Sequence, residues 1–331
     1  MARVFVTRTV PGRTLDILHD AGHETIVWPG ELPPPPDDLA AALRDADAAL
    51  TMVTDRVTGE MLEDSPSLRI IANMAVGYDN ASPEAAARHG VWVTNTPGVL
   101  AETTADFAWS IMLAAARNVA LSDRDTRAGG WKTWSPTGFL GVDLYRATLG
   151  VIGLGEIGEA FARRARGFDM HVLYASRTRK TEAERDYGFE WTSLADLLHR
   201  SDFISLHVPL NDETHHLMGP EQFARVKPGS VLVNTARGQV VDQDALVEAL
   251  REGRLGGAAL DVTDPEPLPL EHPLFSFPQV VITPHIASAS LATRSRMGEM
   301  AAENIVDALA GKEPPHAVNR PVSPRPSSST P

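Results

Sequence analysis

The fold of this chain is decided by residues 150–158, which read GVIGLGEIG. This stretch follows an apolar run and precedes a helical pattern over Glu159–Phe168. In that context Gly153 permits a tight turn, Gly155 lets the backbone approach a pyrophosphate, and Gly158 allows the helix to pack closely on the strand. The start of the helix offers unpaired N–H groups to phosphates. The stretch predicts a dinucleotide-binding βα unit; the alternative is a glycine-rich turn that serves packing alone.

Short β-rich runs alternate with helical patterns along most of the chain, which predicts parallel sheets covered by helices. In the first hundred residues we expect strands at Arg3–Thr7, Glu24–Trp28, Ala48–Val53, Leu68–Asn73 and Val91–Asn95. Helices are expected between them at Thr14–Asp20, Asp37–Asp45, Thr58–Asp64 and Pro83–Arg88. A second block of strands is expected at Leu149–Ile152, His171–Ala175, Phe203–Val208, Ser230–Asn234, Gly257–Asp261 and Val280–Thr283.

The length of 331 residues corresponds to two domains at roughly 150 residues each. We predict an α/β fold of two doubly wound parallel-sheet, Rossmann-like domains with a cleft between them. The first, flavodoxin-like, comprises residues 1–97 and 287–331, and the dinucleotide-binding domain comprises residues 98–286. One long helix is expected over Ala101–Asp125. The last helix, Arg294–Leu309, has no strand to follow it, so we expect it to return to the first domain.

Composition excludes several classes of protein. Hydrophobic residues make up 43% and charged residues 22%, as in ordinary soluble domains. The net charge of −13 argues against a general nucleic-acid binder, and the absence of cysteine excludes disulfides and thiolate chemistry. No apolar run approaches the roughly 20 residues that span a bilayer, so we expect a cytoplasmic protein. The Pro/Ser-rich run Pro324–Pro331 predicts a disordered tail, with a PxxP ligand as the alternative.

The residues after the second strand of the dinucleotide-binding domain bear on cofactor choice. About 20 residues past the glycines, NAD-binding domains carry an acid that binds the ribose diol. Here the chain has Ser176, Arg177 and Thr178, followed by Arg179 and Lys180. Two hydroxyls and three cations suit a phosphate. The sequence therefore favours NADP(H), with NAD(H) as the alternative if these charges form only a solvated surface.

Three polar residues follow later strands of the same domain: Arg237, Glu266 and His285. Because ligands of open α/β sheets bind at the carboxyl ends of the strands, these side chains are catalytic candidates. A guanidinium can bind a carboxylate and a carbonyl oxygen, and an imidazole can donate a proton. A carboxylate beside the imidazole fixes its tautomer. The alternative is a salt-bridge arginine and a structural histidine.

The segments around these residues, 233–238, 260–267 and 281–286, resemble the D-2-hydroxyacid dehydrogenase family over nearly the whole chain. Residues 134–141 and 174–178 resemble its glyoxylate/hydroxypyruvate reductase branch in particular. The resemblance implies NAD(P)H-dependent reduction of small 2-oxo acids to D-2-hydroxy acids by a homodimer, without a metal and without nucleic-acid or membrane partners. Within the family, D-3-phosphoglycerate dehydrogenase is a rival, and an NAD(H)-sensing corepressor is the non-enzymatic alternative.

The resemblance also implies a role for individual residues. Arg237 would bind substrate, His285 would be the acid/base, and Glu266 would be its partner. The backbone N–H groups of Val76 and Gly77 would contact the substrate carboxylate. Trp134, as an alternative to lying buried in its own subunit, would reach toward the site of the neighbouring subunit. The remaining predicted cofactor-binding residues are Thr104, Gly153, Gly155, Glu156, Ile157, Gly158, Ser176, Arg177, Thr178, Thr235, Ala236 and Asp261.

Overall fold

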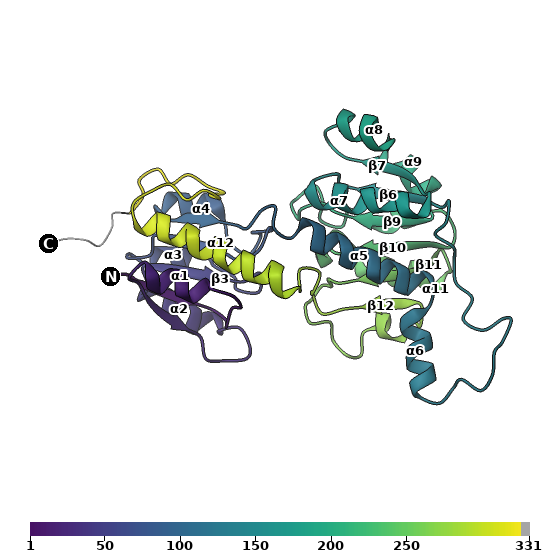
Figure 1. The fold of residues 1–331 in the computed structure, drawn as a ribbon, viewed down its shortest axis with the longest axis horizontal. Coiled ribbons are helices and arrows are strands. Elements are labelled where there is room, and N and C mark those ends of the chain that lie inside the picture. The colour runs from purple at the N-terminus through teal and green to yellow at the C-terminus, as the bar shows by residue number, and fades with distance from the viewer. Residues whose placement is uncertain (326–331) are drawn as a thin grey trace. The chain divides into compact units, whose positions relative to one another are not determined.

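The computed structural model describes residues 1–325, which form two compact units (Figure 1). Unit 1 consists of residues 1–100 and the described residues from Ala289 onward. Unit 2 consists of Ala101–Ser288. Each unit has its own parallel sheet, as the alternation of strands and helices predicts.

Unit 1 is built on a five-stranded parallel sheet in the order β2-β1-β3-β4-β5. This is the flavodoxin-like order of a doubly wound fold. The strand interiors are largely buried because helices cover the sheet, and the central strands β3 and β4 are buried throughout. The strands are β1 Arg3–Val6, β2 Glu24–Val27, β3 Ala48–Thr51, β4 Ile70–Asn73 and β5 Trp92–Thr94.

Three helices of unit 1 begin at hydroxyl caps that the sequence encodes. The hydroxyls of Thr58, Ser82 and Ser290 each accept an N–H bond from the first turn of a helix. The last helix contacts α1 and β4, and the Arg69 guanidinium donates to the Leu309 carbonyl at 3.1 Å. The predicted return of this helix to the first domain is confirmed. The helices are α1 Thr14–Asp20, α2 Pro36–Arg44, α3 Gly59–Glu63, α4 Pro83–Arg88 and α12 Leu291–Leu309.

Unit 2 contains a seven-stranded parallel sheet in the order β12-β11-β10-β9-β6-β7-β8. The order reverses between β6 and β9, which is the switch point of a Rossmann sheet. The short strand β8 is not expected from the sequence. The strands are β6 Thr148–Ile152, β7 His171–Ala175, β8 Glu190–Trp191, β9 Phe203–Leu206, β10 Ser230–Asn234, β11 Leu255–Leu260 and β12 Val280–Ile282.

Helices cover both faces of this sheet and create two hydrophobic cores. One core includes Trp109 and Phe161 from α5 and α7, and the other includes Leu197 and Leu246 from α9 and α11. The α-helices are α5 Ala101–Ala116, α6 Val119–Arg127, α7 Glu156–Arg164, α8 Thr181–Tyr187, α9 Leu194–Arg200, α10 Pro220–Phe223 and α11 Gln243–Arg251. Three 3₁₀ turns cover Ala165–Phe168, Gly238–Val240 and Pro273–Ser276.

The single long helix expected over Ala101–Asp125 is wrong, because the chain breaks it at Asn118. Asn118 adopts a left-handed conformation with φ of 53°, and its side chain donates to the Leu140 carbonyl at 2.9 Å. The N–H of Val142 donates to the Ala116 carbonyl at the end of α5. The returning loop therefore takes an acceptor that a continuous helix would use.

The expected disorder from Pro324 onward is wrong at its first positions. The Arg325 guanidinium donates to the carbonyls of Leu68 at 2.9 Å and Leu62 at 3.1 Å. These bonds hold the chain against the segment that precedes β4. The rest of that prediction, residues 326–331, lies outside the described residues.

Candidate active site

Most predicted site residues of unit 2 follow strands of one parallel sheet, so they share its carboxyl edge. Gly153 comes after β6, Ser176 after β7 and Arg237 after β10. Asp261 comes directly after β11, and His285 follows β12 by three residues. β10, β11 and β12 are neighbours in the sheet. The topology therefore brings the three loops of the catalytic candidates next to one another.

His285 and Glu266 form a direct pair. The imidazole Nδ1 lies 2.9 Å from Glu266 Oε2, and the two side chains are 32% and 34% exposed. The other carboxylate oxygen, Oε1, accepts the N–H of Thr263 at 3.2 Å. A carboxylate on Nδ1 selects the tautomer and orients the ring, which leaves Nε2 for proton transfer. The pair has the geometry of an oriented acid/base.

The turn that carries His285 is wrapped around the buried carboxylate of Asp261. Asp261 Oδ1 accepts from the Thr283 hydroxyl at 2.7 Å and from the Ile286 N–H at 2.9 Å, and Oδ2 accepts from the Ala287 N–H at 2.7 Å. Burial raises the pKa of Asp261, while these bonds oppose the rise. His285 itself has φ of 53°, a conformation that costs energy outside glycine. Asp261 therefore holds a strained turn in place.

Asn234, which the sequence analysis did not single out, shapes the loop of Arg237. This buried side chain accepts the Ala236 N–H at 3.0 Å and donates to the Arg237 carbonyl at 2.8 Å. The Arg237 guanidinium donates to the Ala236 carbonyl at 2.8 Å. An asparagine that ends a buried strand beside a catalytic candidate was the available signal.

The loop of Arg237 lies against the loop of Glu266. A Cβ on Gly238 would meet the carbonyl oxygen of Thr263 at 2.0 Å, so only glycine allows this approach. The Gln239 side chain donates to the Asp264 carboxylate at 3.0 Å, and the Gln243 side chain accepts the Asp264 N–H at 3.0 Å. These bonds tie the two loops to each other.

The glycine loop fits a dinucleotide. Gly153 has φ of +92°, and a Cβ on Gly158 would meet the Gly153 carbonyl oxygen at 2.1 Å. Gly155 faces open space and caps α7, where no side chain takes the first N–H groups. The Thr235 hydroxyl is buried without a hydrogen-bond partner among the described residues, so it is available to a ligand. Glu156 and Ile157 form the first turn of α7.

The loop between β7 and α8 does not present its polar groups equally. The Ser176 hydroxyl donates to the Thr178 carbonyl at 2.7 Å. Arg177 makes one long ion pair with Glu213, at 3.4 Å between highly exposed side chains. The Arg179 guanidinium donates to both carboxylate oxygens of Glu184. The cations of this loop are equivalent in the sequence pattern, and the structure distinguishes them.

The other predicted site residues lie elsewhere in the chain. Thr104 is buried in the first turn of α5, and Trp134 is 79% exposed on the loop that follows α6. Val76 and Gly77 belong to unit 1, where they follow β4. The carbonyls of Val76 and Gly77 accept bonds from the side chains of Asn95 and Asn73, both at 2.8 Å. The substrate and phosphate roles of these four residues stay predictions.

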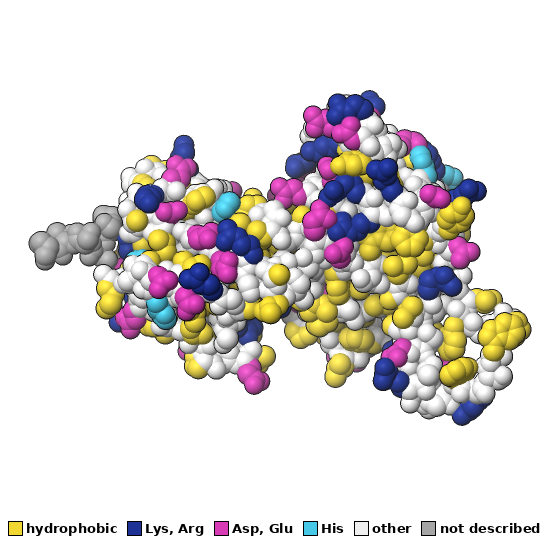
Figure 2. All heavy atoms as spheres, in the orientation of Figure 1, with side chains coloured by type: hydrophobic (Ala, Val, Ile, Leu, Met, Phe, Trp, Pro, Cys, Tyr) yellow, Lys and Arg dark blue, Asp and Glu magenta, His cyan; other side chains and the backbone are white. Residues whose placement is uncertain are grey.

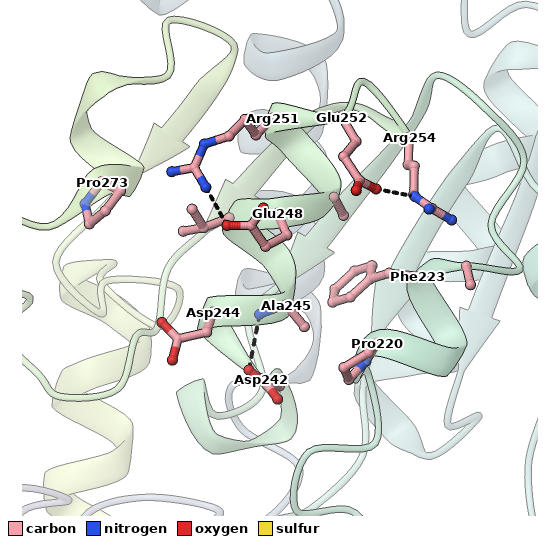
Figure 3. A pocket seen from close by; sticks show the side chains of 13 residues that line it. Pro220, Phe223, Asp242, Asp244, Ala245, Glu248, Arg251, Glu252, Arg254 and Pro273 are labelled. Atoms are coloured by element: carbon pink, nitrogen blue, oxygen red, sulfur yellow. Dashed lines mark hydrogen bonds and ion pairs between the residues drawn. The ribbon is translucent and has the colours of Figure 1, made fainter.

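A surface groove of about 610 Å³ lies between α10 and α11 (Figure 3). Its rim carries the ion pairs Glu248–Arg251 and Glu252–Arg254. None of the predicted site residues lines it, so it is separate from the acid/base pair. Within residues 1–325, no helix is long and apolar enough to cross a membrane, and no group of three His, Asp or Glu side chains is placed to hold a metal ion.

Comparison with known proteins is consistent with this geometry. Residues 109–287 match the family described as D-isomer specific 2-hydroxyacid dehydrogenase, NAD binding domain. A glyoxylate reductase of Korarchaeum cryptofilum is 49% identical over 97% of this chain and 96% of its own length. A Thermus thermophilus crystal structure, 47% identical, superposes with a TM-score of 0.90 over 96% of this chain and 99% of that one.

A crystal structure of an NADPH-dependent glyoxylate/hydroxypyruvate reductase from Sinorhizobium meliloti is 32% identical. It has a TM-score of 0.82 and covers 96% of this chain and 98% of that one. The Rossmann sheet, its glycine loop and the oriented histidine define an oxidoreductase that uses a nicotinamide cofactor. The chain belongs to the D-isomer specific 2-hydroxyacid dehydrogenase family.

Proposed function

We propose that the chain reduces glyoxylate and hydroxypyruvate to the corresponding 2-hydroxy acids, with NADPH as the preferred reductant. The observation that carries the proposal is the 2.9 Å contact between His285 Nδ1 and Glu266 Oε2, on the edge of the sheet that also carries the glycine loop. The choice of substrates is supported by the names of the relatives in Korarchaeum cryptofilum and Sinorhizobium meliloti.

The catalytic residues divide the work of carbonyl reduction. The reduced nicotinamide supplies a hydride when it is bound. His285 donates the proton from Nε2 to the carbonyl oxygen, a step worth about 10²–10⁴ in rate. Glu266 binds Nδ1 and so fixes the tautomer and the orientation of the ring. The guanidinium of Arg237 binds the substrate carboxylate and stabilises the negative charge that develops on the oxygen.

The preference for NADPH is supported by the loop after β7. Residues 176–178 carry two hydroxyls and a guanidinium and no acid, which suits a 2′-phosphate better than a ribose diol. Arg177 is 80% exposed and is held by a single long ion pair. Its guanidinium is therefore free to turn toward a phosphate at little cost.

We also propose a homodimer that uses the segment after α6. Every residue of α6 is at least partly exposed, and the long loop that follows it runs away from the sheet (Figure 1). Figure 2 shows hydrophobic side chains gathered on this loop. The large ones among them that are exposed are Trp131, Trp134, Phe139, Leu140, Val142 and Tyr145. Such an apolar surface is typical of an interface between subunits.

The substrate proposal is tested by the absorbance of NADPH and NADH mixed with glyoxylate, hydroxypyruvate, pyruvate and phosphohydroxypyruvate in turn. We expect the highest kcat/KM for glyoxylate or hydroxypyruvate with NADPH. A clear preference for phosphohydroxypyruvate would identify a phosphoglycerate dehydrogenase instead, and a preference of tenfold or more for NADH would refute the cofactor assignment.

The assigned roles are tested by His285→Ala and Arg237→Ala. Each variant is expected to bind NADPH like the parent chain, measured by fluorescence titration, and to lose about 10²–10⁴ in turnover. Full activity in either variant would refute its role.

Analytical ultracentrifugation of Trp134→Ala beside the parent chain tests the dimer, because removal of a central aromatic side chain shifts the equilibrium toward monomer.

A further inference from the structure

Arg179 and Arg177, two of the three cations that follow β7, differ in how their charge is compensated. Arg179 Nε lies 2.8 Å from Glu184 Oε1, and Arg179 Nη2 lies 2.7 Å from Oε2. The same guanidinium lies 5.7 Å from the centre of the Trp191 ring. Such a two-point pair largely neutralises Arg179. Arg177, with its single contact of 3.4 Å to Glu213, keeps most of its charge.

Glu184 is itself held in this position by a buried hydroxyl. Tyr174 has no exposed surface, and its hydroxyl donates to Glu184 Oε1 at 2.6 Å. The Glu184 side chain is only 17% exposed. The bonds from Arg179 and Tyr174 lower the pKa of Glu184 to about 2, so the carboxylate is charged at neutral pH.

The backbone of the loop is fixed at both ends. The Tyr174 hydroxyl accepts the Lys180 N–H at 2.8 Å, and the Trp191 indole donates to the Ser176 carbonyl at 3.4 Å. In Figure 2 basic and acidic side chains gather over α8, the helix that carries Glu184. The bonds from Tyr174 to Glu184 and to the Lys180 N–H thus keep Glu184 beside Arg179.

We propose that Glu184 determines cofactor specificity by masking Arg179. The inference rests on the proposed use of NADPH and specifies which groups make the selection. With Arg179 neutralised, recognition of the 2′-phosphate depends on Arg177, Lys180 and the hydroxyls of Ser176 and Thr178. The chain then binds NADPH less tightly than it would with all three cations unmasked. The affinity for NADH, which has no charge at that position, is unaffected.

The test is Glu184→Gln, which removes the charge but keeps an oxygen that can accept from Tyr174. Release of one cation beside the phosphate is expected to lower the Kd and KM for NADPH about fivefold, the size of a partly exposed charge pair. The values for NADH are expected to stay within about twofold, with no change in kcat. Glu182→Gln is the matched control, because it removes the same charge from the first turn of α8 without touching Arg179.

A double-mutant cycle with Arg179→Met assigns the effect to the masked cation. Arg179→Met alone is expected to leave the Kd for NADPH within about twofold of the parent value. In the double variant Glu184→Gln/Arg179→Met, the gain in NADPH affinity seen in Glu184→Gln is expected to disappear. Unchanged or weaker NADPH binding in Glu184→Gln, an equal gain in Glu182→Gln, or a gain that persists without Arg179 would each overturn the proposal.

Arg177→Met separates this proposal from the assignment of NADPH itself. If Arg177 binds the phosphate, its loss is expected to raise the Kd for NADPH about tenfold or more, as for a charge-assisted bond. A parent chain that prefers NADH, together with an Arg177→Met variant that binds NADPH normally, would refute the cofactor assignment. The masking by Glu184 is judged separately, by whether its effect on NADPH binding requires Arg179.

Discussion

The turn that carries His285 and the loop that carries Arg177 belong to one sheet but are held by different kinds of bond. The turn that carries His285 surrounds the buried carboxylate of Asp261, which accepts three hydrogen bonds. The loop that carries Arg177 is held largely through Glu184, by an ion pair to the exposed Arg179 and by the hydroxyl of the buried Tyr174. Buried bonds are costly to break and little affected by salt, whereas surface pairs are weak and easily changed. The proton-transfer site is thus rigid, and the cofactor-selecting loop is adjustable.

Among variants of these two loops, Asp261→Asn is expected to have the largest effect on stability and turnover. The amide cannot accept all three bonds, so a buried N–H is left unpaired and the strained turn of His285 loses its anchor. We expect a loss of about 2–3 kcal/mol in the free energy of unfolding, measured with urea, and at least tenfold in turnover. Thr283→Val removes one of the bonds and is the graded control. A fully active Asp261→Asn variant would show that the turn of His285 keeps its conformation without the Asp261 carboxylate.

His207, which follows β9, is expected to limit stability in acid. Its ring packs on Phe161 at 4.8 Å between centroids, its Nε2 lies 2.9 Å from the Ser205 hydroxyl, and burial lowers its pKa to about 3. Since the unfolded form binds the proton near pH 6.5, stability is complete above that pH and falls toward pH 3. Between pH 6.5 and 5 the loss is about 2 kcal/mol.

Urea unfolding of the parent chain and of His207→Gln at pH 7 and pH 5 measures this contribution. The variant is expected to lose less stability than the parent chain over that interval, because Gln does not titrate. Equal losses in the two proteins would mean that His207 is protonated in the folded state without penalty.

A smaller effect is expected from Tyr174→Phe on the adjustable loop. The change removes the hydroxyl that serves both Glu184 and the Lys180 N–H. We expect a loss of about 1 kcal/mol in the free energy of unfolding. Because the same hydroxyl holds Glu184 against Arg179, the Kd for NADPH should fall slightly while turnover at saturating NADPH stays unchanged. A loss of turnover instead would show that this loop is coupled to the chemistry.

The smallest effect is expected from Glu213→Gln, which removes the exposed partner of Arg177. Thermal unfolding should not change measurably, because both side chains are mostly in solvent. The Kd for NADPH should fall slightly at low salt and match the parent chain at high salt, where exposed charges are screened. A change that is independent of salt would contradict a purely electrostatic role.

The regular elements were predictable where the pattern is local. Helices α1 and α4 and strand β10 have the predicted bounds, because the apolar pattern of each is local and the Ser82 hydroxyl caps α4. The break at Asn118 was not predictable, because it depends on a bond to Leu140, more than 20 residues away. The two-residue strand β8 has too little sequence to show a period.

The sequence by itself determined the parallel sheets, the glycine loop and the order of Arg237, Glu266 and His285, because each depends on residue types at short spacing. Only the tertiary structure decided how these residues are supported. Asp261 became the anchor of the His285 turn because neighbouring parallel strands end side by side. Arg179 became a masked cation because the buried Tyr174 holds Glu184 against it. Charge and composition are read from a sequence, but which charges neutralise one another depends on distances that only folding sets.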